Sequence, residues 1–218
     1  MNAIQQVMSN DNQPISLDAQ MTGYYQLHAR IYDSTRWTFL FGRRWLLDLL
    51  PFDKADKFTI VEVGCGTGFN LRQLSKRYYK AKLIGIDVAK PMLDIAKKKT
   101  ETIDNTLILK KLAYGTEGSA ATEKPDAVLF SYCLTMVNPD WETLVLQAKS
   151  DLSAGGCVAV VDFHDSPFSI FRRWMRFNHV RMEGHVLPFL EAHFSTVKVE
   201  KRKAYLGLWT YFLFIGKK

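Results

Sequence analysis

The chain has 218 residues, of which 47% are hydrophobic, so it can bury one substantial core, and we expect a single domain. Its net charge of +7 favours an anionic partner, a condition that nucleic acid, an acidic membrane surface or an acidic small molecule would each satisfy. No apolar run approaches the ~18 residues that span a bilayer, and the polar stretch from Met1 to Gln20 does not resemble a signal peptide, so we expect a cytoplasmic protein.

The N-terminal part of the chain changes character near residue 23. The first 20 residues are polar with little periodicity, whereas from Gly23 to Leu50 aromatic and aliphatic residues recur mostly every three or four positions. We expect a loose arm followed by one long or broken helix.

Beyond residue 50 short β-rich runs alternate with helical segments, as in βαβ units. The expected strands are 58–63, 82–87, 106–109, 127–132 and 157–161, the last continuing into 162 and 163, and the expected helices are 70–79, 91–100 and 141–152. Such an order predicts a parallel sheet with helices on both faces, because right-handed crossovers place them there.

The C-terminal third follows another pattern. Ser166 and Pro167 are suited to begin a helix, and two further β-rich runs, 196–201 and 208–215, predict an antiparallel pair at the edge of the sheet. The expected fold class is a single α/β domain with a doubly wound, mostly parallel sheet and an antiparallel C-terminal hairpin.

The cysteines Cys65, Cys133 and Cys157 have no Cys-x-x-Cys spacing, and the histidines lack the spacing of metal ligands. We therefore expect reduced thiols and no metal site.

A glycine-rich loop follows the first expected strand. Gly64, Gly66 and Gly68 come just after Glu62 and lead into a helix, so they permit a tight turn and let a ligand approach the backbone and the free N–H groups of the helix. Their spacing differs from the dinucleotide fingerprint Gly-x-Gly-x-x-Gly. About twenty residues further on, the second strand ends in Asp87, where a carboxylate is placed to accept hydrogen bonds from ribose hydroxyls. An ordinary strand-to-helix turn with a solvated acid is the alternative.

Three stretches together are similar to the successive motifs of class I S-adenosylmethionine-dependent methyltransferases. They are 61–68 (Val-Glu-Val-Gly-Cys-Gly-Thr-Gly), 85–88 (Gly-Ile-Asp-Val) with Met92-Leu93, and 152–156 (Leu-Ser-Ala-Gly-Gly), and they cover about residues 58 to 163. The resemblance implies S-adenosylmethionine as cofactor, with its methionine portion on the glycine loop, its ribose on Asp87 and its adenine near Val88 and Met92. One departure is that Lys111-Leu112-Ala113 offers no acid for the adenine amino group.

The resemblance thus predicts a set of cofactor-binding residues. They are Tyr32, Arg43, Glu62, Gly64, Cys65, Gly66, Gly68, Asp87, Val88, Met92, Ala113 and Ser131. Tyr32 and Arg43 belong to residues 1–50, which we expect to form an arm and helices that cover the cofactor site, whereas 51–218 form the methyltransferase domain. A guanidinium such as that of Arg43 suits the cofactor carboxylate.

The flanking segments resemble bacterial N-methyltransferases that complete betaine lipids from diacylglyceryl-homoserine. The similar segments are 24–37 with 41–43, 131–136 with Asp140-Trp141, and 160–163. They imply N-methylation of a lipid or lipid-like amine.

Methyl transfer needs a nucleophile held in line within about 3–3.5 Å of the methyl carbon, and aromatic faces suit both the sulfonium and the quaternary ammonium. We expect Tyr32 and Tyr132 to form a cage for the amine. Asp162 and His164 are the candidates to orient the amine or accept its proton. For each of these residues a structural role is the alternative.

The expected helix within 166–181 carries Phe168, Phe171, Trp174 and Met175 as an apolar stripe, with Arg172, Arg176 and His179 on another face. Such a helix either lies in a membrane interface and presents an anionic lipid, or packs on the core with a solvated arginine face. The first reading would place the protein peripherally at the inner face of the membrane.

Other functions stay open. The acceptor can be a soluble amine, phenol or quinone-like molecule; the chain can be a nucleotide-binding oxidoreductase, or a methyltransferase-like protein that binds without turnover. Nucleic acid is disfavoured, because no basic patch interleaved with aromatics stands beside the glycine loop in sequence.

Overall fold

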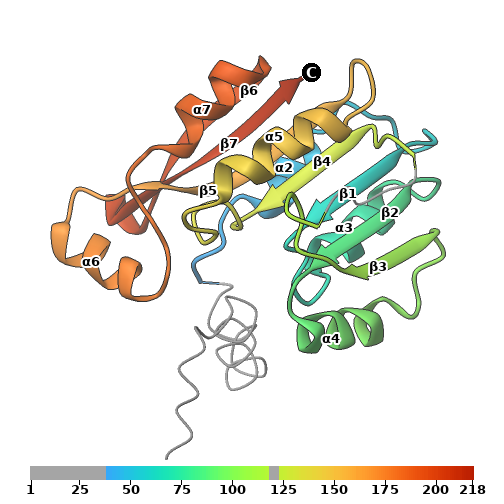
Figure 1. Cartoon of the computed structure of the whole chain (residues 1–218), viewed down its shortest axis with the longest axis horizontal. Helices are drawn as coiled ribbons and strands as arrows, with labels where there is room; N and C mark the ends of the chain where they lie inside the picture. Colours follow the sequence, from blue (N-terminus) through green and yellow to red (C-terminus); the bar gives the residue numbers. More distant parts are fainter. Residues whose placement is uncertain (1–37, 118–122) are drawn as a thin grey trace, which may run out of the picture.

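Seven strands form one sheet in the order β3-β2-β1-β4-β5-β7-β6 (Figure 1). The computed structural model describes residues 38–117 and 123–218. The strands are β1 (Thr59–Val63), β2 (Lys82–Asp87), β3 (Leu107–Lys111), β4 (Ala127–Ser131), β5 (Cys157–Asp165), β6 (Ser195–Ala204) and β7 (Trp209–Lys217). β1 to β5 pair in parallel, whereas β7 is antiparallel to both β5 and β6.

The central strands are apolar because both of their faces are covered. In β5, Ala159 and Val161 belong to the core on one face of the sheet, and Val158 and Val160 to the core on the other. Alternate side chains of a strand point to opposite faces, so a continuous apolar run is what a doubly covered strand requires.

Helices supply the rest of the two cores. They are α2 (Arg43–Asp48), α3 (Phe69–Arg77), α4 (Lys90–Thr100), α5 (Trp141–Asp151), α6 (Ser169–Phe177) and α7 (Val186–His193), with the short 3-10 helix η1 (Tyr205–Gly207). Leu46 of α2 and Leu71 of α3 are fully buried in one core, and Val145 of α5 and Leu190 of α7 in the other.

The predicted fold class is confirmed, and the bounds of the predicted strands and intervening helices agree with the structure to within three residues. The hairpin differs in one respect: only β6 lies at the edge, while β7 is inserted between β6 and β5. Phe212 and Phe214 of β7 are fully buried, so the hairpin belongs to the core.

At three places the structure departs from the local predictions or adds to them. Within the described part of 23–50, residues 38–42 form turns and only Arg43–Asp48 are helical, because Gly42 adopts a left-handed conformation (φ 79°) at the start of α2. The helix α7 was not predicted. α6 begins at Ser169, because Ser166 closes a turn that precedes the helix, with its hydroxyl accepting from the Phe168 N–H (3.2 Å).

In the described ranges, no helix combines the length and the apolar character that crossing a membrane requires.

Candidate cofactor-binding and active site

A cavity of about 650 Å³ opens beside the carboxyl ends of β1, β2 and β4. Ligands of doubly wound sheets bind at this edge, where the strand order reverses, here between β1 and β4. The predicted site residues that line it are Arg43, Glu62, Gly64, Cys65, Gly66, Asp87, Val88, Met92, Ala113, Ser131 and Tyr132. Tyr32 lies outside the described residues.

The glycine loop between β1 and α3 exposes bare backbone to the cavity. Gly64 and Gly66 have positive φ angles of 70° and 53°, and a Cβ at Gly64 would meet Cys133 Sγ at 2.8 Å. Gly68 is not part of the cavity wall; its φ of 78° starts α3, and a Cβ there would press on Ala96 of α4 at 3.2 Å. The third glycine thus serves the packing of α3 on α4.

The carboxylate of Asp87 fastens the glycine loop to the end of β2. Its Oδ2 accepts from the Gly66 N–H (2.8 Å) and its Oδ1 from the Ala89 N–H (2.9 Å). Burial raises the pKa of Asp87, and these backbone donors act against that rise. A carboxylate has about four acceptor positions, so Asp87 can hold the loop and still accept from a ligand hydroxyl.

Glu62 is a buried carboxyl group in the cavity wall, with an exposed fraction of 2%. Its Oε1 accepts from Asn70 Nδ2 (2.7 Å), whereas its Oε2 has no partner. Burial raises its pKa to about 8, and the Asn70 bond and the charge of Arg43 act against this. Asn70 Oδ1 and Ser131 Oγ are also buried in this wall without a hydrogen-bond partner.

These orphaned polar atoms indicate a polar ligand, because buried polar groups without partners are costly. Glu62 Oε2 suits an ammonium group, and the Arg43 guanidinium, whose Cζ lies 4.0 Å from the centre of the Phe69 ring, suits a carboxylate. Asp87 suits a pair of ribose hydroxyls. The residues present therefore fit S-adenosylmethionine, which combines an amino acid and a nucleoside.

The cavity wall after β3 contains a carboxylate that the motif at 111–113 does not offer. Glu117 lines the cavity, and its Oε2 accepts from the Ala113 N–H (2.9 Å). The intervening turn brings a carboxylate four residues beyond Ala113 to the same wall, which no motif at 111–113 could indicate.

Tyr132 follows β4 in a left-handed conformation (φ 54°). Its hydroxyl donates to the Phe41 carbonyl (2.7 Å), and its ring packs edge-on against Phe163 with the centroids 4.7 Å apart. The ring lies in the cavity wall, while its place near the acceptor and its catalytic role stay predictions.

Asp162 and His164 do not line the cavity, so the structure gives the predicted contact with the amine no support. Asp162 is fully buried and accepts from the Thr135 hydroxyl (2.5 Å) and the Phe163 N–H (2.8 Å), although burial raises its pKa to about 6. His164 packs against Phe212 and Gly184.

Besides Asn70 and Glu117, the sequence reasoning missed Asn138 and Asp140 among the polar residues of the cavity wall. Asn138 Nδ2 donates to the Thr135 carbonyl (3.0 Å), and its Oδ1 is buried without a partner. A polar pair just before a predicted helix was the one available signal, because chain that follows the carboxyl end of a parallel strand lies at the ligand-binding edge.

The sheet order, with the glycine loop and the Asp87 carboxylate beneath it at the carboxyl edge, is that of the class I methyltransferase fold. Residues 60–156 match the family described as "Methyltransferase domain". They contain β2 to β4, all but the first residue of β1, the glycine loop and Asp87, and the match agrees with the motifs found in the sequence.

Curated relatives match over part of their length. Malonyl-[acyl-carrier protein] O-methyltransferase of Acetivibrio thermocellus is 27% identical over 124 residues, which cover 57% of this chain and 42% of that protein. The enzyme of the same description from Halalkalibacterium halodurans is 28% identical over 129 residues, which cover 56% of this chain and 46% of that protein. The chain thus spans less than half the length of these relatives.

Solved structures share the fold over nearly the whole chain. N-methyltransferase NodS from Bradyrhizobium japonicum WM9, in complex with S-adenosylhomocysteine, has a TM-score of 0.70 at 17% identity, covering 89% of this chain and 97% of that one. Burkholderia thailandensis 1,6-didemethyltoxoflavin-N1-methyltransferase, also with S-adenosylhomocysteine, has a TM-score of 0.71 at 13% identity, covering 97% of this chain and 93% of that one. The [4+2]-cyclase SpnF has a TM-score of 0.74 at 15% identity, covering 94% of this chain and 98% of that one. Identities this low establish the fold alone.

Proposed function

We propose that this chain transfers the methyl group of S-adenosylmethionine to the nitrogen of a lipid or lipid-like amine. The observation that carries the methyltransferase part is the cavity wall in which Gly66 N–H and Asp87 are joined by a 2.8 Å hydrogen bond beside the unpartnered Glu62 Oε2. This wall presents acceptors for an ammonium group and for ribose hydroxyls within one cavity.

Each wall residue has a defined task in this proposal. Glu62 and Arg43 hold the amino and carboxylate groups of the cofactor, Asp87 holds the ribose, and Glu117 accepts from the adenine amino group. When bound, the cofactor supplies a methyl carbon already activated by a sulfonium. The protein therefore has to orient the nucleophile and exclude water.

The acceptor end of the cavity is apolar and aromatic. Leu40, Tyr132, Met136 and Val137 line it together with the unpartnered Asn138 Oδ1. A low-dielectric wall lowers the pKa of a bound amine and favours the neutral, nucleophilic form, so no side-chain base is required. Asn138 Oδ1 can accept a hydrogen bond from that amine and aim its lone pair.

The lipid part of the proposal is supported by the flanking resemblance to betaine-lipid N-methyltransferases and by this apolar end. A soluble acceptor is the competing candidate, since the relatives are described as acting on malonyl-[acyl-carrier protein] and one structural neighbour on 1,6-didemethyltoxoflavin.

Incubation with methyl-labelled S-adenosylmethionine and a bacterial lipid extract tests the proposal. We expect label in an amine-containing lipid after organic extraction.

Asp87→Ala should weaken cofactor binding by about 10- to 100-fold, the cost of one or two charge-assisted hydrogen bonds, measured by calorimetry with S-adenosylhomocysteine. Tyr79→Ala, a change at a 59% exposed ring that does not line the cavity, is the matched control. Label found only in water-soluble products would rule out the lipid acceptor, and absence of cofactor binding would rule out the methyltransferase.

A further inference from the structure

The apolar face of α6 points away from the core. Ile170 and Phe177 are each 84% exposed and Trp174 is 49% exposed, and their spacing puts them on one side of the helix. Met175, on the opposite side, is buried. The apolar stripe predicted for this helix is thus split between two faces. Phe171 and Met175 face inward, whereas Trp174 faces outward together with Ile170 and Phe177.

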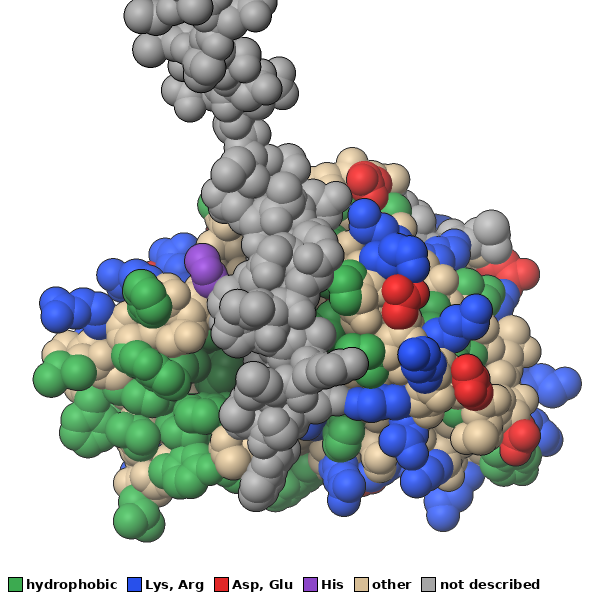
Figure 2. Space-filling model, turned by 90° about the horizontal axis from the view of Figure 1, so that it is seen from below, with side chains coloured by type: hydrophobic (Ala, Val, Ile, Leu, Met, Phe, Trp, Pro, Cys, Tyr) green, Lys and Arg blue, Asp and Glu red, His purple; other side chains and the backbone are tan. Residues whose placement is uncertain are grey.

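The turn η1 adds a second apolar projection beside this helix. Leu206 has a left-handed conformation (φ 58°) and is fully exposed, and its neighbour Tyr205 is 53% exposed. Leu206, Ile170 and Phe177 are the three most exposed large hydrophobic side chains of the described residues. Figure 2 shows hydrophobic side chains gathered at this end of the molecule.

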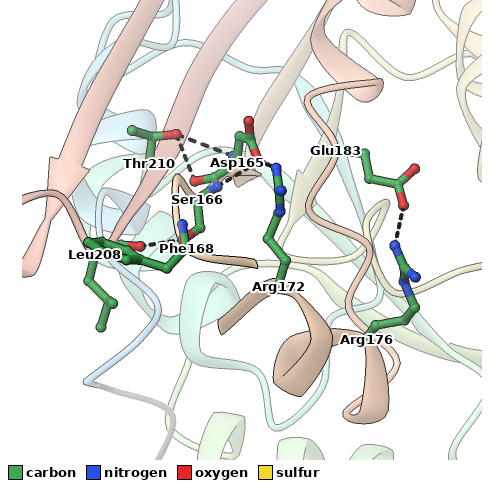
Figure 3. Close-up of polar contacts among 8 residues, drawn as sticks. All are labelled: Asp165, Ser166, Phe168, Arg172, Arg176, Glu183, Leu208 and Thr210. Atoms are coloured by element: carbon green, nitrogen blue, oxygen red, sulfur yellow. Dashed lines mark hydrogen bonds and ion pairs between the residues drawn. The ribbon is translucent and has the colours of Figure 1, made fainter. Parts of the chain in front are cut away.

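The two projections are held together as one surface (Figure 3). The Ser166 hydroxyl, just before α6, donates to the Leu208 carbonyl, just after η1, at 2.6 Å. Asp165 and Thr210 add two hydrogen bonds, of 3.2 and 3.0 Å, and Phe171 stacks on Trp209 with centroids 5.5 Å apart. We call Ile170, Trp174, Phe177, Tyr205 and Leu206 the α6–η1 surface.

The charge around this surface is positive. Arg176 and Arg181 share one carboxylate, that of Glu183, at 2.9 and 2.8 Å, and Arg172 lies 3.4 Å from Asp165. Arg173 is exposed on α6 and has no acidic partner among the described residues. The four arginines between residues 172 and 181 thus outnumber the two carboxylates that pair with them, and this excess of positive charge favours an anionic partner.

The surface also adjoins the cavity. Phe39 packs against Trp174 (centroids 6.1 Å apart) and Phe41 against Tyr205 (5.5 Å), while Leu40 between them lines the cavity. A molecule held at the α6–η1 surface is therefore separated from the cavity wall by a single short segment of chain.

We propose that the α6–η1 surface docks on an anionic lipid bilayer. Ile170, Phe177 and Leu206 enter the apolar boundary, Trp174 and Tyr205 lie at headgroup depth, and the arginines face lipid phosphates. An anionic bilayer has an apolar interior beneath a negatively charged headgroup layer. Two projections that end in apolar side chains and are flanked by arginines are complementary to both layers. Docking deepens the proposed function, because it explains how a lipid amine reaches the cavity, yet it stands on contacts outside the cofactor site.

Vesicle sedimentation with the full chain, without cofactor or acceptor, tests docking. We expect binding to vesicles of phosphatidylcholine with phosphatidylglycerol, weaker binding to phosphatidylcholine alone, and a decrease as salt is added. The double variant Ile170→Glu/Phe177→Glu should lower partitioning by about tenfold or more, since it removes two inserted side chains and adds negative charge. Leu146→Glu, at a 47% exposed position of α5, is the matched control and should bind like the unmodified chain.

Brominated phosphatidylcholine in the same vesicles identifies the contact, because bromine quenches tryptophan fluorescence at short range. We expect quenching in the unmodified chain and its loss in Trp174→Phe. Unchanged partitioning of the double variant overturns the proposal. A lipid-free dimer that Ile170→Glu dissociates also overturns it, since the surface would then be an interface between two copies. Cofactor affinity, measured separately by calorimetry, should be unchanged in the double variant, so loss of docking is distinguished from failure of the proposed activity.

Discussion

Glu62 is a buried carboxyl group whose ionisation destabilises the ligand-free protein. Its carboxyl group has one hydrogen-bond partner, and its burial raises the pKa to about 8. In the unfolded chain the same group ionises near its ordinary pKa of 4.5. An acid whose folded pKa is raised contributes stability that is fully present below the unfolded pKa and lost as pH rises through the folded pKa.

Replacing Glu62 by Gln should therefore stabilise the ligand-free protein at pH 8 and weaken the cofactor. Glu62 should make the free energy of unfolding of the unmodified chain fall between pH 4.5 and 8, by no more than about 1.4 kcal/mol per pH unit, and Glu62→Gln should remove this share of the slope. Urea unfolding at several pH values measures it. Binding of S-adenosylhomocysteine should weaken about 10- to 100-fold through loss of a charge-assisted bond. Equal affinity of the variant would show that Glu62 does not contact the ligand.

The placement of Gly64, Gly66 and Asp87 at the cavity was predictable because it depends on local order along the chain. A tight turn between strand and helix needs glycines at set positions, and an acid ending the next strand must lie beside it. Asp162 and His164 were not predictable to the same degree. Whether a residue near the end of a strand faces the cavity depends on which face is covered by α5 and α7, and that is a matter of packing.

At the level of elements, the contact between the loop after β4 and the segment before α2 closes one side of the cavity. Tyr132 and Phe41 are 91 positions apart, and the hydrogen bond from the Tyr132 hydroxyl joins them. Gly42 beside Phe41 has no room for a side chain, because its Cβ would lie 2.7 Å from the Tyr211 ring. The segment 38–42 is thus held by a few specific contacts rather than by regular structure.

Tyr132→Phe should loosen this segment while keeping the ring. Loss of the bond to the Phe41 carbonyl should cost about 0.5–1.5 kcal/mol of stability and speed amide hydrogen exchange in residues 38–42. Tyr78→Phe is the matched control, because that hydroxyl donates to the Leu47 carbonyl (3.0 Å) from outside the cavity. It should cost a similar free energy without affecting cofactor affinity. Unchanged exchange in 38–42 would contradict the role given to Tyr132.

For the whole molecule, the inserted strand β7 joins the C-terminal hairpin to the parallel part of the sheet. It pairs with β5 on one side and β6 on the other, and Phe214 is fully buried in the core shared with α5 and α7. The last described strand therefore completes a core begun by the first, and folding of the described domain should be cooperative.

Phe214→Ala tests that cooperativity away from the cofactor site. We expect a loss of about 3–5 kcal/mol in the free energy of unfolding, with one thermal transition retained and with S-adenosylhomocysteine still raising the melting temperature. Leu146→Ala, at an exposed position of α5, should change stability by no more than about 0.5 kcal/mol. Two separate transitions would show that the hairpin unfolds independently of the parallel half.

The order of strands and helices, the glycine loop and the acid ending β2 could be read from the sequence, because hydrophobic period, turn residues and motif spacing are properties of neighbouring residues. Tertiary structure alone decided that β7 is interior, that Glu117 and Asn138 reach the cavity while Asp162 and His164 do not, and that Ile170 and Phe177 face outward. Those outcomes depend on which surfaces are buried by segments distant in the sequence. The free energy of that burial comes from contacts between distant residues, so no local stretch of the chain reveals it.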